Sequence, residues 1–323
     1  MCNELYYIKK QYNDMSRNYG VGSRCMNSAG VLIINKSSLS FSSKATLKTR
    51  WGQFYNYAKE KNVKKLENID ESLVIDYGLF LQNRVDDETL SIATAHNYIS
   101  VINTVMRLVN NNWVLISATQ QCHIAKRNRI SIKNKGISDE DHNKVKKNVS
   151  SRLSSIIDLE RYMGLRFKES SLINAKKTLE TSLNNSTVEI SKGTKGGRKR
   201  NIPVTQKIID VLKVAANIQD GNSMVQKDLS YKHFMSKCYS EITNLDFNFH
   251  GERHYYAQSR YEEITEAPAP IVAGWKRNER IGKLSIYLSI NTIDANILDK
   301  KARLIIAEEL GHGREEISNV YLG

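Results

Sequence analysis

Cysteine is scarce in this chain: four cysteines occur in 323 residues, and no two of them form a CxxC pair. Cysteines spread in this way offer no disulfide framework, so we expect reduced thiols in a cytosolic protein. Long apolar runs are missing too, because stretches such as Val31–Ile34 fall far short of the roughly 18 apolar residues of a membrane span. The first residues also lack the basic-then-apolar order of a signal peptide. These absences argue against a secreted or membrane-spanning protein and predict a cytoplasmic location.

The signatures of several common enzymes are also missing. The chain has no GxxxxGK[ST] phosphate loop, because the glycines of Gly193–Gly197 lack that spacing, and it has no GxSxG nucleophile elbow. His250–His254 holds two histidines, but the segment is neither HExxH nor HxxEH, and no clear third metal ligand follows. We therefore expect no metal site and no nucleotide cofactor.

Positive charge is in clear excess, with 48 Lys and Arg against 34 Asp and Glu, a net charge of +14 and a pI near 9.4. The apolar and charged fractions, 40% and 25%, are those of ordinary globular proteins, which excludes a mainly disordered chain. The length predicts two domains. Excess charge favours a polyanion partner, although ribosomal and membrane-surface proteins are basic as well, so the charge alone does not name it.

The first part of the chain is expected to be helical after a polar start. Residues 1–40 are predicted to form an irregular N-terminal arm, with a nucleic-acid-binding extension as the alternative. Helices are then predicted after an N-cap at Ser43, from Asp70, and after Ser91, with a weaker helix over 115–127. No strand-like alternation interrupts these segments, so a small helical bundle is expected.

A basic stretch, Lys126–Lys147, joins this bundle to the second half of the chain. It includes the turn Asn134–Gly136, typical of a linker, and Ser138, which we predict to cap the next helix. Such a charge run is usually a solvated face, but here it lies between two domains, where a groove could hold a ligand.

The second half mixes helices with one hairpin. A helix is predicted from Ser138 to about Tyr162, and two short strands are predicted over 187–190 and 201–204, with a turn rich in glycine between them. Further helices are predicted after Thr205, after Ser230 and from about Asp294 to Leu310.

Four short motifs in this half combine basic residues, histidines and a tyrosine. They are G-L-R-F-K-E at 164–169, Lys195 in the hairpin turn, H-G-E-R-H-Y at 250–255, and L-G-H at 310–312 with Tyr321 nine residues later. Each match alone is weak, and a surface arginine, a solvated lysine or a packing tyrosine would explain it. Their order and spacing together are specific.

In these motifs the chain resembles the tyrosine recombinases, the integrase family of phages and mobile elements. The family pattern is Arg-x-x-Glu, a lysine in a β-hairpin, His-x-x-Arg, Leu-Gly-His and a tyrosine nine residues on, and every position is filled here. The resemblance covers residues 41–323. It implies a mainly α fold with a small β-sheet: a helical core-binding (SAM-like) bundle at 41–133 and a catalytic domain at 137–323, which together form a C-shaped clamp on DNA.

The resemblance also implies the role of each site residue. Arg166, Arg253 and His312 would hold the phosphate, because guanidinium and imidazole N–H groups stabilise the charge that develops on its oxygens. Tyr321 would be the nucleophile that forms a covalent phosphotyrosyl bond. His250 matches the acid–base partner of the tyrosine, and Lys195 matches the general acid that protonates the 5′-oxygen. Glu169 matches a carboxylate that orients the cations of the site. This scheme needs no cofactor and no metal.

The partner implied is double-stranded DNA. Phosphate contacts are expected from the linker and the hairpin, at Lys126, Arg127, Arg129, Lys133, Arg198 and Arg200. The resemblance further implies site-specific recombination, as an integrase of a mobile element, by a homotetramer on two paired sites. Accessory DNA-bending or directionality factors and a nucleoid-associated location in a prokaryote are part of the same expectation, and no membrane is involved.

The chain departs from the family pattern in several places. Glu252 stands where an aliphatic residue is usual, and Ser170 stands where an apolar residue is common. The third and fourth motifs are also unusually far apart, which predicts an insertion at about 262–293 in the catalytic domain. Only two residues follow Tyr321, so we expect no C-terminal helix of the kind that many relatives donate to a neighbouring subunit, and the usual linkage between subunits is not predicted here.

Three alternatives remain open from the sequence. The chain could be a dimer-resolving (Xer-like) or inversion recombinase, a catalytically inactive DNA-binding relative, or a type IB topoisomerase, which shares the chemistry. Covalent capture of DNA excludes the inactive relative, and strand joining between two sites distinguishes a recombinase from a topoisomerase.

Overall fold

The computed structural model of the chain describes residues 24–127, 130–131, 133–314 and 318–323. The chain divides into two compact units, with the boundary between residues 128 and 129. The described residues are mainly helical and contain one small sheet, so the predicted fold class is confirmed. No helix in the described ranges is both long and apolar enough to span a bilayer.

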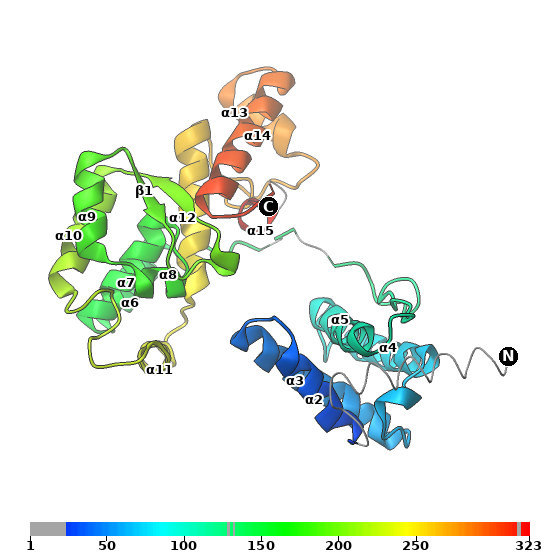
Figure 1. Cartoon of the computed structure of the whole chain (residues 1–323). Coiled ribbons are helices and arrows are strands. Elements are labelled where there is room, and N and C mark those ends of the chain that lie inside the picture. The colour runs from blue at the N-terminus through cyan, green and yellow to red at the C-terminus, as the bar shows by residue number, and fades with distance from the viewer. Residues whose placement is uncertain (1–23, 128–129, 132, 315–317) are drawn as a thin grey trace. The chain divides into compact units, whose positions relative to one another are not determined.

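Unit 1 is a bundle of helices around an apolar core (Figure 1). Its elements are α2 (Met26–Lys36), α3 (Phe41–Glu60), η1 (Leu66–Asn68), α4 (Glu71–Asp86) and α5 (Ile92–Val109). Helix α5 packs against α2, α3 and α4. The predicted caps Asp70 and Ser91 are confirmed, because each side chain accepts a hydrogen bond from the backbone N–H three residues on. Helix α3 instead has its N-cap at Ser40, three residues before the predicted cap Ser43.

The start of unit 1 corrects the prediction of an irregular arm over residues 1–40. Residues 26–36 form α2, and residues 1–23 lie outside the described part. Ala29 and Ile33 repeat at helical spacing and are buried in the core. Gly30 lies so close to the Trp51 ring that a side chain there would collide with it. The polar composition of the whole arm had concealed this short apolar face.

The weak helix predicted over 115–127 is also wrong, because this segment forms turns and irregular backbone. Asn103 on α5 replaces the missing helical hydrogen bonds. Its amide donates to the Ile116 carbonyl at 2.8 Å and accepts from the Ile116 N–H at 3.0 Å. A buried segment without regular structure needs such partners for its backbone.

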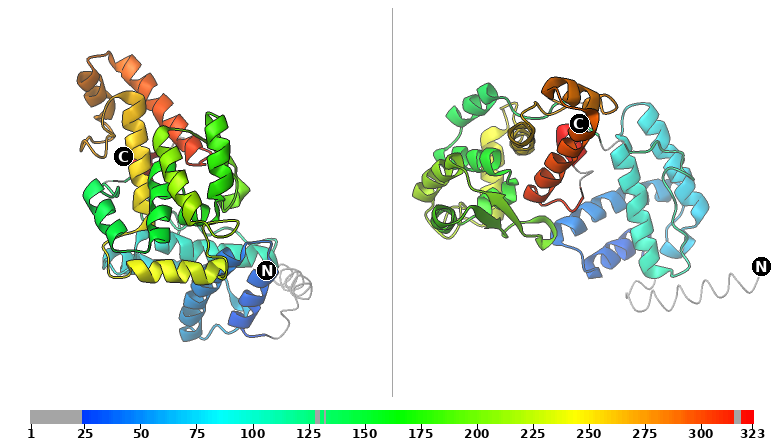
Figure 2. Two further views of the ribbon diagram at one scale, coloured as in Figure 1. Left: turned by 90° about the vertical axis from the view of Figure 1, so that its left-hand side faces the viewer. Right: turned by 90° about the horizontal axis from the view of Figure 1, so that it is seen from above.

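Unit 2 holds helices around one hairpin (Figures 1 and 2). Its first elements are α6 (Asp139–Lys147), α7 (Ser151–Met163), α8 (Phe167–Leu172), α9 (Ala175–Asn184), β1 (Thr187–Ile190), η2 (Lys195–Gly197) and β2 (Arg200–Pro203). Its later elements are α10 (Gln206–Ile218), α11 (Tyr231–Ile242), α12 (Phe249–Thr265), α13 (Arg280–Leu288), α14 (Thr292–Glu309) and α15 (Asn319–Leu322).

The hairpin is antiparallel, with Thr187 opposite Pro203 and Ile190 opposite Arg200, so the second strand begins one residue before the predicted range 201–204. The single helix predicted from Ser138 to Tyr162 is two helices, because Ser150 caps a new start at α7. Asn148 ends α6 before it.

Helix α12 is central to unit 2, since it packs against α7, α14 and α15 (Figure 2). The segment predicted as an insertion, about 262–293, begins in the last turn of α12 and includes α13. Leu284 of α13 packs with Ala267 and Ala295 in a small separate cluster. The segment therefore has its own apolar contacts beside the main core of unit 2.

Candidate active site

The Tyr321 hydroxyl is the point at which the third and fourth predicted motifs meet. The side chain lies on the short helix α15 and is only 3% exposed. Its oxygen is 3.3 Å from Arg253 Nε, 3.3 Å from His312 Nε2 and 3.5 Å from His250 Nε2. His250 and Arg253 come from one face of α12, because they are three residues apart. His312 comes from the turn after α14.

Arg253 anchors this cluster to two other elements. It is completely buried, and its guanidinium donates to the carbonyls of Gly164, at the end of α7, and Leu310, at the end of α14. Burial lowers the pKa of Arg253 to about 10, which still leaves it charged at neutral pH. Gly164 has φ +59°, and a side chain there would lie 2.6 Å from Tyr256, so glycine is needed for this close approach.

The two histidines beside Tyr321 are neutral at neutral pH. Burial, followed by the nearby charges of Arg253 and Arg166, lowers the pKa of His250 to about 4. The same causes lower the pKa of His312 to about 3. A neutral imidazole carries one free lone pair and one N–H. His250 can therefore accept a proton, and His312 can donate a hydrogen bond.

Arg166 and Glu169 form a second cluster at the start of α8. The Glu169 carboxylate accepts from the Arg166 backbone N–H and from Arg166 Nη1, both at 2.8 Å. It also accepts from Arg200 Nη1 at 3.0 Å and Nη2 at 2.6 Å. Burial raises the pKa of Glu169, but the Arg200 and Arg166 contacts lower it by more. Arg166 remains 24% exposed, so its guanidinium is accessible to a ligand.

Arg200 does not have the position predicted for a DNA contact. It is buried and its guanidinium is bound to Glu169, so a contact of Arg200 with phosphate stays a prediction that this position does not favour. The strand pattern could have revealed this, since Arg200 and Ile202 are both buried and alternate with the exposed Asn201. Arg200 is thus a structural residue that the sequence interpretation missed.

Arg200→Met should lower the free energy of unfolding by about 3 kcal/mol, because it leaves the buried Glu169 carboxylate short of its main partner. Arg198→Met is the matched control and should change it by less than about 0.5 kcal/mol, since Arg198 is exposed. Urea unfolding followed by circular dichroism measures both. Equal effects of the two substitutions would contradict the structural role of Arg200.

Lys195 lies apart from the other candidate residues. It is exposed in the turn η2, and among the described residues it has no side-chain hydrogen bond or ion pair. The adjacent Gly196 and Gly197 have φ of +70° and +71° with open space around them. The structure therefore does not bring Lys195 together with Tyr321.

The other predicted DNA contacts are on the surface. Lys126, Arg127, Lys133 and Arg198 are exposed, whereas Arg129 lies outside the described residues. The Arg198 guanidinium lies against Gly313, directly after His312.

Two further groups near the site were not predicted. The His254 ring is 2% exposed and lies 4.7 Å from the Tyr321 ring. The unusual Ser170 donates to the completely buried Glu160, and burial raises the pKa of this carboxyl well above its usual value. In the part of the chain that the structure describes, no three His, Cys, Asp or Glu side chains are grouped as metal ligands.

Comparison with known proteins gives a match to one family model and to several solved structures. Residues 124–262 match the family model described as Integrase. A lambda integrase dimer bound to a COC′ core site is similar to this chain with a TM-score of 0.58 and 12% identity, covering 95% of this chain and 80% of that one. The Tn1549 transposon integrase in complex with circular intermediate DNA gives a TM-score of 0.54 at 9% identity, covering 91% and 95%. No curated protein sequence matches.

A third similar structure is the XerH site-specific recombinase bound to difH, with a TM-score of 0.51 and 16% identity, covering 94% of this chain and 83% of that one. The chain therefore shares the fold of these integrase and recombinase structures, and residues 124–262, less than half of the chain, match the Integrase family model. The predicted resemblance is confirmed for the fold and, over residues 124–262, by the family model.

Proposed function

We propose that this chain is a DNA-breaking and rejoining enzyme in which Tyr321 attacks a phosphodiester and forms a covalent 3′-phosphotyrosyl intermediate. The observation that carries this proposal is the convergence of Arg253, His312 and His250 on the Tyr321 hydroxyl, within 3.5 Å. A buried phenol among neutral imidazoles and a guanidinium is suited to lose its proton and attack phosphorus.

Each group has a defined part in the attack. As the bond from the tyrosine oxygen to phosphorus forms, neutral His250 accepts the phenolic proton. Arg166, Arg253 and His312 stabilise the negative charge on the non-bridging oxygens. Glu169 orients Arg166. The bond from phosphorus to the 5′-oxygen then breaks, and Lys195 gives that oxygen a proton, which requires the exposed turn η2 to bring the lysine to the site when DNA binds.

The biological setting that we propose is the integration and excision of a mobile element in a prokaryotic cytoplasm, on nucleoid DNA. The Tn1549 transposon integrase on circular intermediate DNA supports this choice by its fold. A homotetramer would act on two paired sites, with an accessory bending or directionality factor. The two units would close around the duplex as a C-shaped clamp.

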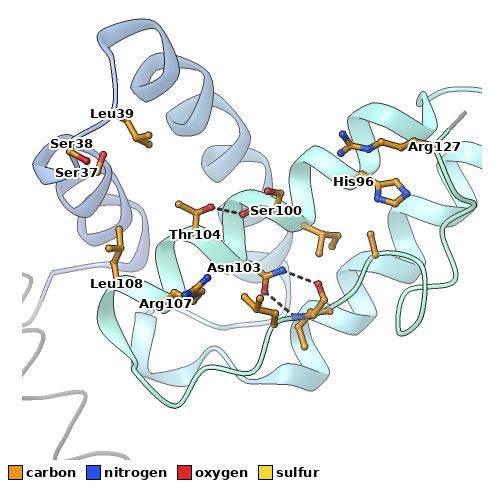
Figure 3. A pocket seen from close by; sticks show the side chains of 14 residues that line it. Ser37, Ser38, Leu39, His96, Ser100, Asn103, Thr104, Arg107, Leu108 and Arg127 are labelled. Atoms are coloured by element: carbon orange, nitrogen blue, oxygen red, sulfur yellow. Dashed lines mark hydrogen bonds between the residues drawn. The ribbon is translucent and has the colours of Figure 1, made fainter. Parts of the chain in front are cut away.

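A groove of about 700 Å³ in unit 1 offers a surface for the DNA backbone (Figure 3). Arg107 and Arg127 line it, whereas the hydroxyl of Thr104 on α5 already donates to the Ser100 carbonyl at 2.8 Å. Arginine guanidinium groups are common donors to phosphate oxygens. Asn103 in the same groove already holds Ile116, so it stabilises the groove wall.

Binding to duplex DNA should weaken steeply with salt, because basic residues of both units displace counterions from phosphates. The logarithm of the binding constant should fall by about 0.9 per unit of log salt for each phosphate neutralised. Replacing Arg107 and Arg127 by Ala should reduce this slope by about 2. Fluorescence anisotropy over a range of salt concentrations measures this slope. A binding constant that does not change with salt would contradict the proposal that both units hold the duplex.

The function is tested by incubating the protein with the DNA that flanks its own gene. A covalent protein–DNA adduct is expected at one position on each strand. Joining of strands between two sites is expected as well and separates a recombinase from a topoisomerase. Binding without any adduct would show a catalytically inactive relative.

A further inference from the structure

The carboxylate of Glu252 sits in a buried charged cluster behind the active-site helix. Glu252 is fully buried on α12, between His250 and Arg253. Its Oε1 is 2.9 Å from His142 Nδ1, and its Oε2 accepts from Arg161 Nη1 at 2.5 Å. His142 lies on α6 and Arg161 on α7.

His142 is held between two carboxylates. Its Nε2 lies 3.1 Å from Asp158 Oδ1 on α7, opposite the contact of Nδ1 with Glu252. An ionised carboxylate can only accept hydrogen bonds, so both ring nitrogens must carry a proton to make both bonds. A neutral imidazole has one N–H and would leave one buried carboxylate facing a lone pair. The geometry requires the imidazolium form.

The charges around His142 agree with this form. Besides Asp158 and Glu252, the ring faces Arg161 and the Tyr162 ring from α7. Lys146 on α6 binds Asp158 at 2.7 Å, and Arg161 binds Asp139 at 2.7 Å. These groups comprise three carboxylates and two cations, so a protonated His142 makes the cluster neutral. Burial would lower the pKa of His142, but the hydrogen bonds to Asp158 and Glu252 raise it by more.

The cluster lies on the far side of α12 from the active site. Because each residue turns the helix by about 100°, Glu252 points roughly 200° away from His250. Arg161 adds a contact between its guanidinium and the Tyr255 ring at 3.2 Å and donates to the Ile137 carbonyl at 3.1 Å. Fixing Glu252 therefore fixes the rotation of α12, and with it the direction in which His250 and Arg253 point.

We propose that Glu252 is a positioning residue of the active site, and that it works only while His142 is a doubly protonated imidazolium. This inference rests on the proposed function for the identity of the residues that are positioned. The hydrogen bonds of His142 to Asp158 and Glu252 are both complete below about pH 6.5, the usual pKa of histidine. One of them is lost as the pH rises through the raised pKa of His142.

The protonation state is tested first, by NMR of the full chain labelled with ¹⁵N at histidine. Both ring nitrogens of His142 should carry protons at pH 7, and His142→Gln identifies the signals. His233, exposed on α11, provides the reference spectrum of a histidine ring that is not held between two carboxylates. A neutral His142 tautomer at pH 7 would overturn the proposal, whatever the protein does to DNA.

The positioning role is tested by the rate of covalent adduct formation in His142→Gln. Glutamine donates only from its amide nitrogen, so one carboxylate bond is lost at every pH. The rate should fall by about 100-fold at pH 6, as expected for a misplacement near 1 Å, with DNA affinity unchanged. The ratio of wild-type to variant rates should shrink as the pH rises, because His142 of the wild type then loses a proton and one of its two carboxylate hydrogen bonds. His233→Gln should match the wild type throughout.

The outcomes separate this inference from the proposed function. Rates are corrected for the folded fraction measured by circular dichroism at each pH. A merely structural role would give a rate ratio near one after that correction, or a ratio that does not change with pH, and either result would overturn the positioning role. If the wild type forms no adduct, the proposed function and the positioning role both fail, whereas the NMR result still decides the imidazolium.

Discussion

Tyr321→Phe should bind DNA with the affinity of the wild type and form no covalent adduct. The substitution removes one hydroxyl, which contacts Arg253, His312 and His250, and leaves the buried ring in place. Without that oxygen no phosphotyrosyl bond can form. Denaturing gel electrophoresis with labelled DNA detects the adduct, and anisotropy measures the affinity.

Tyr287→Phe is the matched control for this experiment. Tyr287 is 57% exposed on α13, so removing its hydroxyl should leave adduct formation unchanged. An adduct formed by Tyr321→Phe would show that another residue is the nucleophile, and the assignment of the fourth motif would then be lost.

Lys195→Ala should slow cleavage of normal DNA by about 10²–10⁴-fold, the range of a general acid. The 5′-oxygen is a poor leaving group that needs a proton. A 5′-bridging sulfur leaves as a thiolate without one, so the same variant should cleave a phosphorothiolate substrate at nearly the wild-type rate. Single-turnover cleavage of the two substrates gives the comparison.

The controls locate the proton donor among the hairpin cations. Arg166→Ala should stay slow on both substrates, because phosphate charge develops in either case. Lys192→Ala and Lys199→Ala should keep most activity on both, since Lys192 is exposed and Lys199 pairs with Glu189 at 3.2 Å. Sulfur rescue of Lys192→Ala, or none of Lys195→Ala, would place the general acid elsewhere.

Local features of the fold were predictable because short-range chemistry controls them. Asp70, Ser91, Ser138, Thr205 and Ser230 begin helices as expected, since each side chain accepts from the N–H three residues on. The hairpin followed from two β-branched runs around a glycine-rich turn.

The candidate site was predictable in its residues but not in its contacts. The order and spacing of the motifs predicted that one site is formed by Arg166, His250, Arg253, His312 and Tyr321. The sequence did not show that Arg253 holds the ends of α7 and α14 through backbone carbonyls. Nor did it indicate His254, because nothing in the local pattern separates a histidine that packs on Tyr321 from any other histidine in a helix.

By itself, the sequence determined where α4, α5, α6, α10 and α11 begin, the order of the four motifs and the family that the chain resembles. Only the tertiary structure decided how the charged side chains are used. Arg198 is exposed and Arg200 is bound to Glu169, although both were predicted to bind DNA. Glu252 pairs with His142, 110 residues away, which no local pattern could indicate. The physical reason is that a buried charge is stable only beside a partner, and distant segments supply that partner when the chain folds.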